Sequence, residues 1–276
     1  MNVISSEEVS PPERRRLQAR ARRLARRAET LADAGRVDEA IECQSEVAAL
    51  RPDDSAAFFR LGLLYREARR IEPAVDALRR AQHLSPGERD PREALIETLL
   101  EAGRFNEVIA EGKALVRLAP RSLFARDVLC VAYLQMGQID KAVRVAGEMI
   151  FLDPLSPVHH FKRAMLLQQQ GSLKAAVGEY ARALDMAAPD SEIHNDAAEA
   201  LQSLDEYQIH QILLLASEDR YFRQKLRQDT VEAAAERGFF LSEGGQARLQ
   251  ALAQHQFLDA VGAPSVAAWG GVRFYN

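Results

Sequence analysis

Hydrophobic side chains recur along most of the chain at the spacing of one helical face. Leu17, Leu24, Ala28 and Leu31 follow one another in steps of three, four and seven residues, with polar residues between them. Short runs rich in Pro, Gly, Ser and Asp interrupt the later stretches, at residues 52–55, 86–87, 120–122 and 156–157. The pattern predicts a series of short helices joined by tight turns.

These helices repeat with a fixed period. Four prolines mark it, each 34 residues after the one before: Pro52, Pro86, Pro120 and Pro154. Three further columns keep the same step. A glycine column holds Gly35, Gly103, Gly137 and Gly171, with Arg69 in its second place; an alanine column holds Ala40, Ala74, Ala142 and Ala176, with Val108 in its third; a third column holds Leu31, Tyr65, Leu99, Tyr133 and Leu167. A period of this length is typical of stacked helical repeats.

Each column has a mechanical reason. A glycine just past the end of a helix adopts the left-handed conformation that caps it, so the glycine column ends a first helix. A small residue early in a second helix lets the two helices approach closely. A proline cannot continue the helical hydrogen-bond ladder, so it closes the second helix. The columns therefore predict antiparallel helix pairs, with the third column filling the space between the paired helices.

The segment Phe58-Phe59-Arg60-Leu61-Gly62-Leu63-Leu64-Tyr65, followed by Ala74, Leu78, Ala81 and Pro86, resembles the tetratricopeptide repeat family. This resemblance extends over residues 21–188. It implies an all-α fold, a right-handed α-solenoid of about five helix pairs within residues 10–188. It also implies additional helices after the solenoid.

The flanking segments do not follow the period. Residues 1–9 are polar and predict a disordered N-terminus. Residues 189–218, where Asp190-Ser191 is placed to cap a helix, predict two helices that form a degenerate sixth repeat or cap the solenoid. Residues 219–261 predict a helix, a turn at Gly238 and a second helix, and this region resembles small helical segments in the leader regions of some ribosomally made peptide precursors.

Residues 262–276 form an aromatic tail, with Trp269, Phe274 and Tyr275 among glycines. It is too short and too rich in glycine for a helix. Two roles are open: the aromatic rings dock on the protein's own surface, or they offer a short linear ligand to another chain. We favour self-docking, because exposed Trp and Phe side chains are costly to leave in water.

The composition narrows the class of protein. The chain has 276 residues and a net charge of −4, which argues against a global nucleic-acid binder. Cys43 and Cys130 fall in different repeats without a CxxC motif, so we expect neither a disulfide nor a zinc site. We also expect no signal peptide and no membrane span, and the reduced cytoplasm as the location.

The first helix departs from this overall charge, because arginines crowd it. Arg22, Arg23 and Arg26 lie among them. One interpretation is a solvated first helix whose apolar stripe faces the next helix. The other is a patch for an anionic partner such as RNA or an acidic protein tail. The intact apolar spacing favours the first interpretation.

Motifs for catalysis are missing. The sequence has no HExxH, no GxGxxG, no phosphate-binding loop, and no glycine before Ser242 that would make a nucleophile elbow. We therefore expect no enzymatic activity, no cofactor and no metal site.

The resemblance also implies a ligand-facing groove. In the family, the second, fifth, ninth and thirteenth positions of each first helix tend to face a ligand. In this sequence those positions include Phe59 and Leu63; Asp90, Glu93, Glu97 and Glu101; Phe124, Asp127 and Val131; and Phe161. The Lys and Asn set with which some members clamp a C-terminal carboxylate is missing here. The carboxylates predict an acidic floor flanked by apolar side chains, suited to a peptide with basic and apolar residues.

Three functions remain open from the sequence. The first is a scaffold or adaptor without catalysis that binds a peptide or protein in this groove. The second is an accessory or substrate-like factor in peptide modification or secretion, acting through its C-terminal region. The third is an RNA-associated protein that uses the arginine-rich helix. We favour the first.

Overall fold

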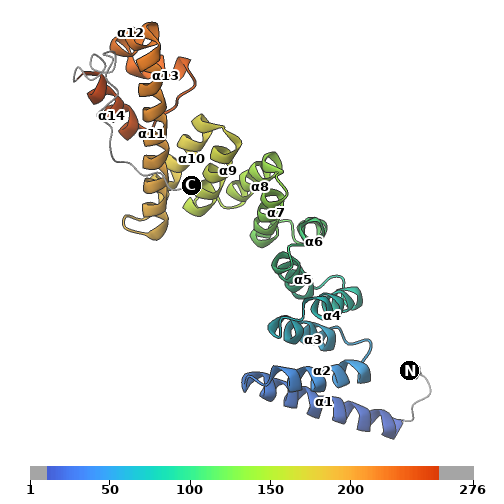
Figure 1. Cartoon of the computed structure of the whole chain (residues 1–276). Helices are drawn as coiled ribbons and strands as arrows, with labels where there is room; N and C mark the ends of the chain where they lie inside the picture. Colours follow the sequence, from blue (N-terminus) through green and yellow to red (C-terminus); the bar gives the residue numbers. More distant parts are fainter. Residues whose placement is uncertain (1–10, 255–276) are drawn as a thin grey trace. The chain divides into compact units, whose positions relative to one another are not determined.

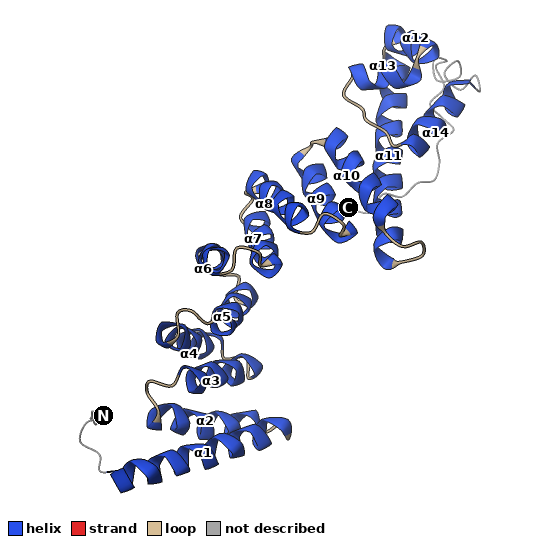
Figure 2. Ribbon diagram, turned by 180° about the vertical axis from the view of Figure 1, so that it is seen from behind, coloured by secondary structure: helices blue, strands red, loops and turns tan. Residues whose placement is uncertain are grey.

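The computed structural model describes residues 11–254, and every regular element in that range is a helix (Figures 1 and 2). The chain divides into an N-terminal unit, residues 1–138, and a C-terminal unit, residues 139–276. The helices of the N-terminal unit are α1 (Pro11–Asp33), α2 (Val37–Leu50), α3 (Ser55–Glu67), α4 (Ile71–Leu84), α5 (Asp90–Glu101), α6 (Phe105–Leu118) and α7 (Leu123–Gln135). Those of the C-terminal unit are α8 (Ile139–Leu152), α9 (Pro157–Gln170), α10 (Leu173–Met186), α11 (Glu192–Glu218), α12 (Arg220–Gln228), α13 (Thr230–Glu236) and α14 (Glu243–Gln254). The predicted all-α solenoid of repeated helix pairs is confirmed in α1 to α10.

The glycine column ends each first helix as predicted. Its four glycines have φ between 68° and 83°, and Arg69 shares this left-handed conformation with φ of 59°. After each column residue, the next backbone N–H donates to the carbonyl of the third column, as from Arg36 to Leu31 and from Arg70 to Tyr65, both at 2.8 Å. This is the hydrogen bond that closes a helix at a left-handed residue. The five turns therefore share one geometry.

The alanine column is buried between helices. All four alanines and Val108 have no exposed surface. Gly62 in α3 shows how little room there is, because a Cβ added there would lie 2.6 Å from Cγ of Leu78 in α4. The contact between α3 and α4 thus requires a glycine at position 62, and the buried column takes alanine in four of its five places.

The proline column marks where each second helix ends, and capping residues mark where the next first helix begins. Each proline follows the last residue of α2, α4, α6 or α8 by two positions. Asp54 caps α3 by accepting from the amides of Ala56 and Ala57, and Ser122 caps α7 by accepting from Ala125. Ser156 precedes the first-turn Pro157 of α9 but makes no side-chain capping bond. The short linkers are therefore fixed locally by backbone and capping hydrogen bonds.

Arginines at the repeat junctions tie consecutive second helices together. Arg70 pairs with Asp38 at 2.8 Å, and one repeat later Arg104 pairs with Glu72 at 3.0 Å. Both carboxylates are about three-quarters exposed, at 76% and 73%. Such exposed pairs contribute about 0–1 kcal/mol each. The stability of the N-terminal unit therefore comes from its apolar clusters, in which Leu78, Leu95 and Leu99 are fully buried.

In the C-terminal unit, α11 is one continuous helix of 27 residues, where the sequence predicted two. Its first half packs Leu201 and Leu204 with residues of α9 and α10. Its second half carries Ile209 and Ile212 into a separate cluster with α12, α13 and α14. The helix spans both clusters without a break.

The region after α11 has three helices, α12 to α14, rather than the predicted two. Phe222 and Leu226 of α12 lie in the core of this cluster, at 1% exposed each. The predicted glycine turn is present, with Gly238 at φ of 84° after α13. The extra break falls at Asp229, which ends α12 and caps α13 by accepting from the Glu232 amide.

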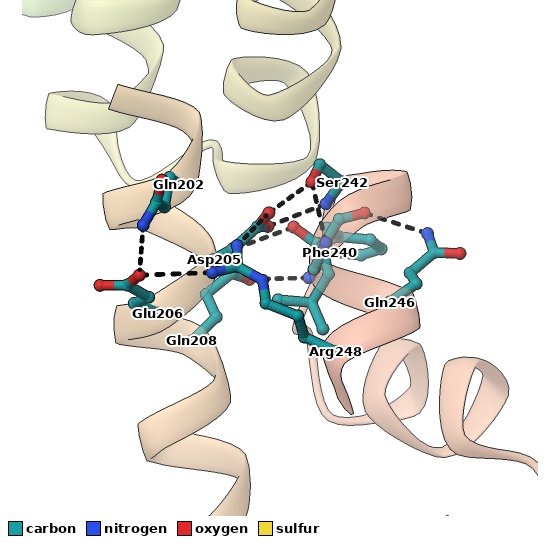
Figure 3. Close-up of polar contacts among 10 residues, drawn as sticks. Gln202, Asp205, Glu206, Gln208, Phe240, Ser242, Gln246 and Arg248 are labelled. Atoms are coloured by element: carbon teal, nitrogen blue, oxygen red, sulfur yellow. Dashed lines mark hydrogen bonds and ion pairs between the residues drawn. The ribbon is translucent and has the colours of Figure 1, made fainter. Parts of the chain in front are cut away.

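Two buried polar side chains of α11 hold the segment that leads into α14 (Figure 3). Gln208 donates to the Phe240 carbonyl at 2.9 Å and accepts from the Phe240 amide at 2.8 Å. Asp205 accepts from the Ser242 amide at 2.9 Å and from the Ser242 hydroxyl. Both side chains are almost fully buried, at 0% and 1% exposed. We call these two residues and their partners, Phe240 and Ser242, the α11 latch.

Gly245 completes the latch, because a Cβ at this position would lie 2.4 Å from the carboxylate carbon of Asp205. Arg248 of α14 faces the same carboxylate, 3.5 Å from its Oδ2. The close approach of backbone and carboxylate explains why a glycine stands in the first turn of α14.

Some predictions fall outside this description. The disordered N-terminus, residues 1–9, and the aromatic tail, residues 262–276, both lie beyond the described residues. Within residues 11–254, no helix is long and apolar enough to cross a membrane. Cys43 and Cys130 are both free thiols.

The latch predicts non-additive mutations. Gly245→Ala should lower the free energy of unfolding by about 1–3 kcal/mol, because the new methyl group overlaps the Asp205 carboxylate. Asp205→Ala should cost about 1–3 kcal/mol by leaving the Ser242 donors unsatisfied. In the double variant the methyl group has room, so the combined loss should fall short of the sum by about 1 kcal/mol. Urea denaturation followed by circular dichroism measures all three, and strictly additive losses would contradict the contact.

Candidate functional site

The predicted groove begins on α3 and α5, the first helices of two consecutive repeats. Arg66 of α3 bonds to Glu97 and Glu101 of α5, residues 31 and 35 positions further along the chain. These separations are close to the 34-residue period. Positions that correspond in the two repeats therefore lie side by side on α3 and α5. Phe59 thus neighbours the position of Glu93, and Leu63 that of Glu97.

The apolar residues of the predicted groove divide into two groups. Phe59 and Phe124 are partly buried and pack against the core of the N-terminal unit. Leu63 and Val131 stand further out, at 37% and 41% exposed. The two phenylalanines are therefore less exposed than Leu63 and Val131.

The predicted acidic floor is partly neutralised inside the protein. Arg66 pairs with Glu97 at 2.5 Å and with Glu101 at 2.7 Å. Its hydrogen bond to Glu101, aided by the one to Glu97, raises the pKa of the Arg66 guanidinium against the opposing effect of burial. Two of the predicted carboxylates thus already have a permanently charged partner.

The other end of α5 keeps its negative charge. Among the described residues, the carboxylates of Asp90 and Glu93 have no cationic partner; Asp90 is exposed and Glu93 half-buried. Both lie in the first turn of α5, where the helix dipole stabilises a negative charge. Asp127 of α7 is half-buried and already takes part in an interaction within the protein. Of the five predicted floor carboxylates, the two at the start of α5 are therefore the ones without a partner among the described residues.

A cleft of about 410 Å³ lies at the opposite end of the same face. It is lined by Leu63, Arg66, Glu67, Arg69 and Glu101. Arg69 stands here in the glycine column, in a left-handed conformation that costs a non-glycine residue about 1–2 kcal/mol. Such strain is common where a side chain serves a ligand. In the sequence Arg69 stands out only as a missing glycine. Arg66 was not predicted, although its position 31 and 35 residues before Glu97 and Glu101, close to one period, was a usable signal.

Phe161 belongs to the C-terminal unit, and its ring packs edge-on against Tyr180, with the centroids 5.6 Å apart. Burial raises the pKa of Tyr180, whose hydroxyl donates to Gln168 at 2.8 Å. Phe161 thus has a packing role in its own unit, and its place in a ligand groove stays a prediction.

The arginines of α1 face solvent. Arg22, Arg23 and Arg26 are exposed, and none has a carboxylate partner among the described residues. Arg20 on the same helix pairs with Glu46 of α2. Of the predicted apolar stripe, Ala28 and Leu31 are buried and Leu17 and Leu24 are partly buried. An anionic partner for this helix stays a prediction.

The comparisons with known proteins agree with the helical architecture. A family model described as a tetratricopeptide repeat matches residues 19–89 and 131–192. No curated protein matches the chain.

Solved structures share the fold at low sequence identity. A MamA chain from Desulfovibrio magneticus is 18% identical, with a TM-score of 0.55, and the match covers 62% of this chain and 98% of that one. YrrB, described as a TPR protein with an unusual peptide-binding site, is 16% identical with a TM-score of 0.53, over 64% of this chain and 90% of that one.

The strain at Arg69 predicts a stabilising substitution. Arg69→Gly should raise the free energy of unfolding by about 1 kcal/mol, because glycine adopts the left-handed conformation without steric cost. The reciprocal change one repeat later, Gly103→Ala, should lower it by about the same amount, since Gly103 has φ of 68° and open space around its Cα. Urea denaturation compares the two, and a loss of stability in Arg69→Gly would contradict the assigned strain.

Proposed function

Because the chain is a tetratricopeptide repeat protein, we propose that it acts as a scaffold that binds a peptide on the face of α3, α5 and α7. Repeats of this kind bury their apolar residues against neighbouring repeats and leave extended surfaces for partners. YrrB, which shares the fold, is described as having a peptide-binding site, and this supports a peptide as the ligand class. The scaffold works by binding alone, without chemistry of its own.

The charge distribution on α5 carries the proposal. Asp90 and Glu93 retain their charge at one end of the helix, beside the position of Phe59, whereas Arg66 neutralises Glu97 and Glu101 at the other. A peptide that presents basic side chains to Asp90 and Glu93 and apolar ones to Leu63 complements this arrangement. At the far end, Arg69 in the cleft is placed to receive a carboxylate of the same peptide.

A charge reversal at Glu93 tests the proposal. The probe is a fluorescein-labelled dodecapeptide that alternates Lys and Leu, titrated with the intact chain by fluorescence anisotropy. Glu93→Lys should weaken binding about three- to tenfold, because it replaces an attraction of up to about 1 kcal/mol with a repulsion of similar size.

The matched control is Glu42→Lys, the same substitution at an exposed position of α2 without a partner among the described residues. It should leave the affinity within a factor of two of the original, whereas equal losses in both variants would reduce the effect to net charge and defeat the proposal. Arg66→Gln releases Glu97 and Glu101, so it should tighten binding of the same probe about two- to fivefold. Weaker binding in Arg66→Gln would place the peptide elsewhere.

A further inference from the structure

The C-terminal unit contains a concave surface that none of the predicted groove residues lines. It consists of a cleft of about 740 Å³ and a smaller hollow of about 260 Å³. Lys174, Gly178 and Phe240 line both, so the two join along one side of α10. We call the joined space the α10 hollow.

The larger part of the α10 hollow is basic. Arg163, Lys174 and Arg182 line it, together with a single carboxylate, Glu179. Glu179 is 4% exposed and already pairs with two cations, Arg163 at 2.8 Å and Arg182 at 3.0 Å, and its other oxygen lies 2.6 Å from His160 Nδ1. No acidic residue stands in the first turn of α10. A surplus of positive charge therefore faces the hollow.

The smaller part is apolar. Val177 of α10, Val231 and Ala234 of α13, Phe239, and Leu249 of α14 line it. Val231 is 37% exposed, although its neighbour Ala234 is buried. Apolar surface that stays open beside a basic cleft fits a ligand that carries both kinds of group.

The wall between the two parts is fixed in advance. Phe240 is the residue that Gln208 grips by both backbone groups in the α11 latch (Figure 3). The ammonium of Lys174 lies 5.4 Å from the centre of the Phe240 ring. Because buried hydrogen bonds already order this wall, ligand binding would cost little further conformational entropy there.

Gly178 forms the open floor shared by both parts. It lies in the middle of α10, where a glycine costs about 1 kcal/mol relative to alanine. A Cβ at this position would meet nothing within 4 Å, so close helix packing does not require the glycine. This contrasts with Gly62, where a Cβ would overlap Leu78. A ligand that occupies this open space would explain why a glycine stands at position 178.

We propose that the α10 hollow is a second peptide-binding site, which takes a segment with carboxylates next to apolar side chains. The carboxylates pair with Lys174 and Arg182, and the apolar side chains enter the space between Val177, Val231 and Phe239. This chemistry is opposite in charge to that proposed for α5. The chain then links a basic partner segment to an acidic one.

The test uses two labelled dodecapeptides, one that alternates Glu and Leu and one that alternates Lys and Leu, with the intact chain. Gly178→Leu fills the hollow with a good helix former, so it should weaken binding of the Glu–Leu peptide at least tenfold without lowering the melting temperature. Lys174→Glu should weaken it at least fivefold. Lys113→Glu, the same change at an exposed position of α6, should leave it within twofold.

The probes also separate the alternatives. Amidation of the Glu–Leu peptide removes its terminal carboxylate. Binding is then abolished if that carboxylate is the recognised group, and it stays intact if the Glu side chains are recognised. Either result supports the site. No binding of the Glu–Leu peptide overturns it, as does binding that survives Gly178→Leu. Binding of a uridine 20-mer that is lost in Lys174→Glu, when the peptide does not bind, would instead assign the surface to nucleic acid. Since the Lys–Leu peptide reports on α5, the two sites fail independently.

Discussion

The structure depends on how closely paired helices can approach at one small residue per repeat. The four alanines of that column and Val108 are fully buried, and Gly62 marks a contact with no room even for a methyl group. Because this contact brings the helices together, neighbouring leucines and valines complete the core within each repeat and its neighbours. Exposed ion pairs such as Arg70 with Asp38 add little stability, so the outer faces are free to vary.

The two units carry different charges on these outer faces. In the N-terminal unit, the carboxylates at the start of α5 have no cationic partner among the described residues, whereas Arg66 neutralises those at its end. In the C-terminal unit, Glu179 is compensated and the cations around it are in surplus. Buried hydrogen bonds of Asp205 and Gln208 fix the geometry there, where the repeat period no longer does.

The sequence predicted the repeated part well because its period is set by residues with single mechanical roles. A glycine at the left-handed turn and an alanine at the helix contact can be read without knowing the rest of the fold. It was wrong at α11, where two helices were predicted and one continuous helix is found. This helix runs through Asp205 and Gln208, whose buried side chains bond to Ser242 and Phe240, more than 30 positions away. Local patterns in the sequence did not reveal these long-range contacts. The neutralisation of Glu97 and Glu101 was missed for the same reason, since a pair across repeats depends on their register.

The central claim is that, in the N-terminal unit, the peptide binds on the first helices α3, α5 and α7 and not on the second helices. Hydrogen–deuterium exchange of the intact chain, with and without saturating Lys–Leu dodecapeptide, tests it most directly. The account predicts slower exchange in α3 and α5 and unchanged exchange in α2, α4 and α6. Protection confined to the second helices, or none anywhere despite binding, would contradict it.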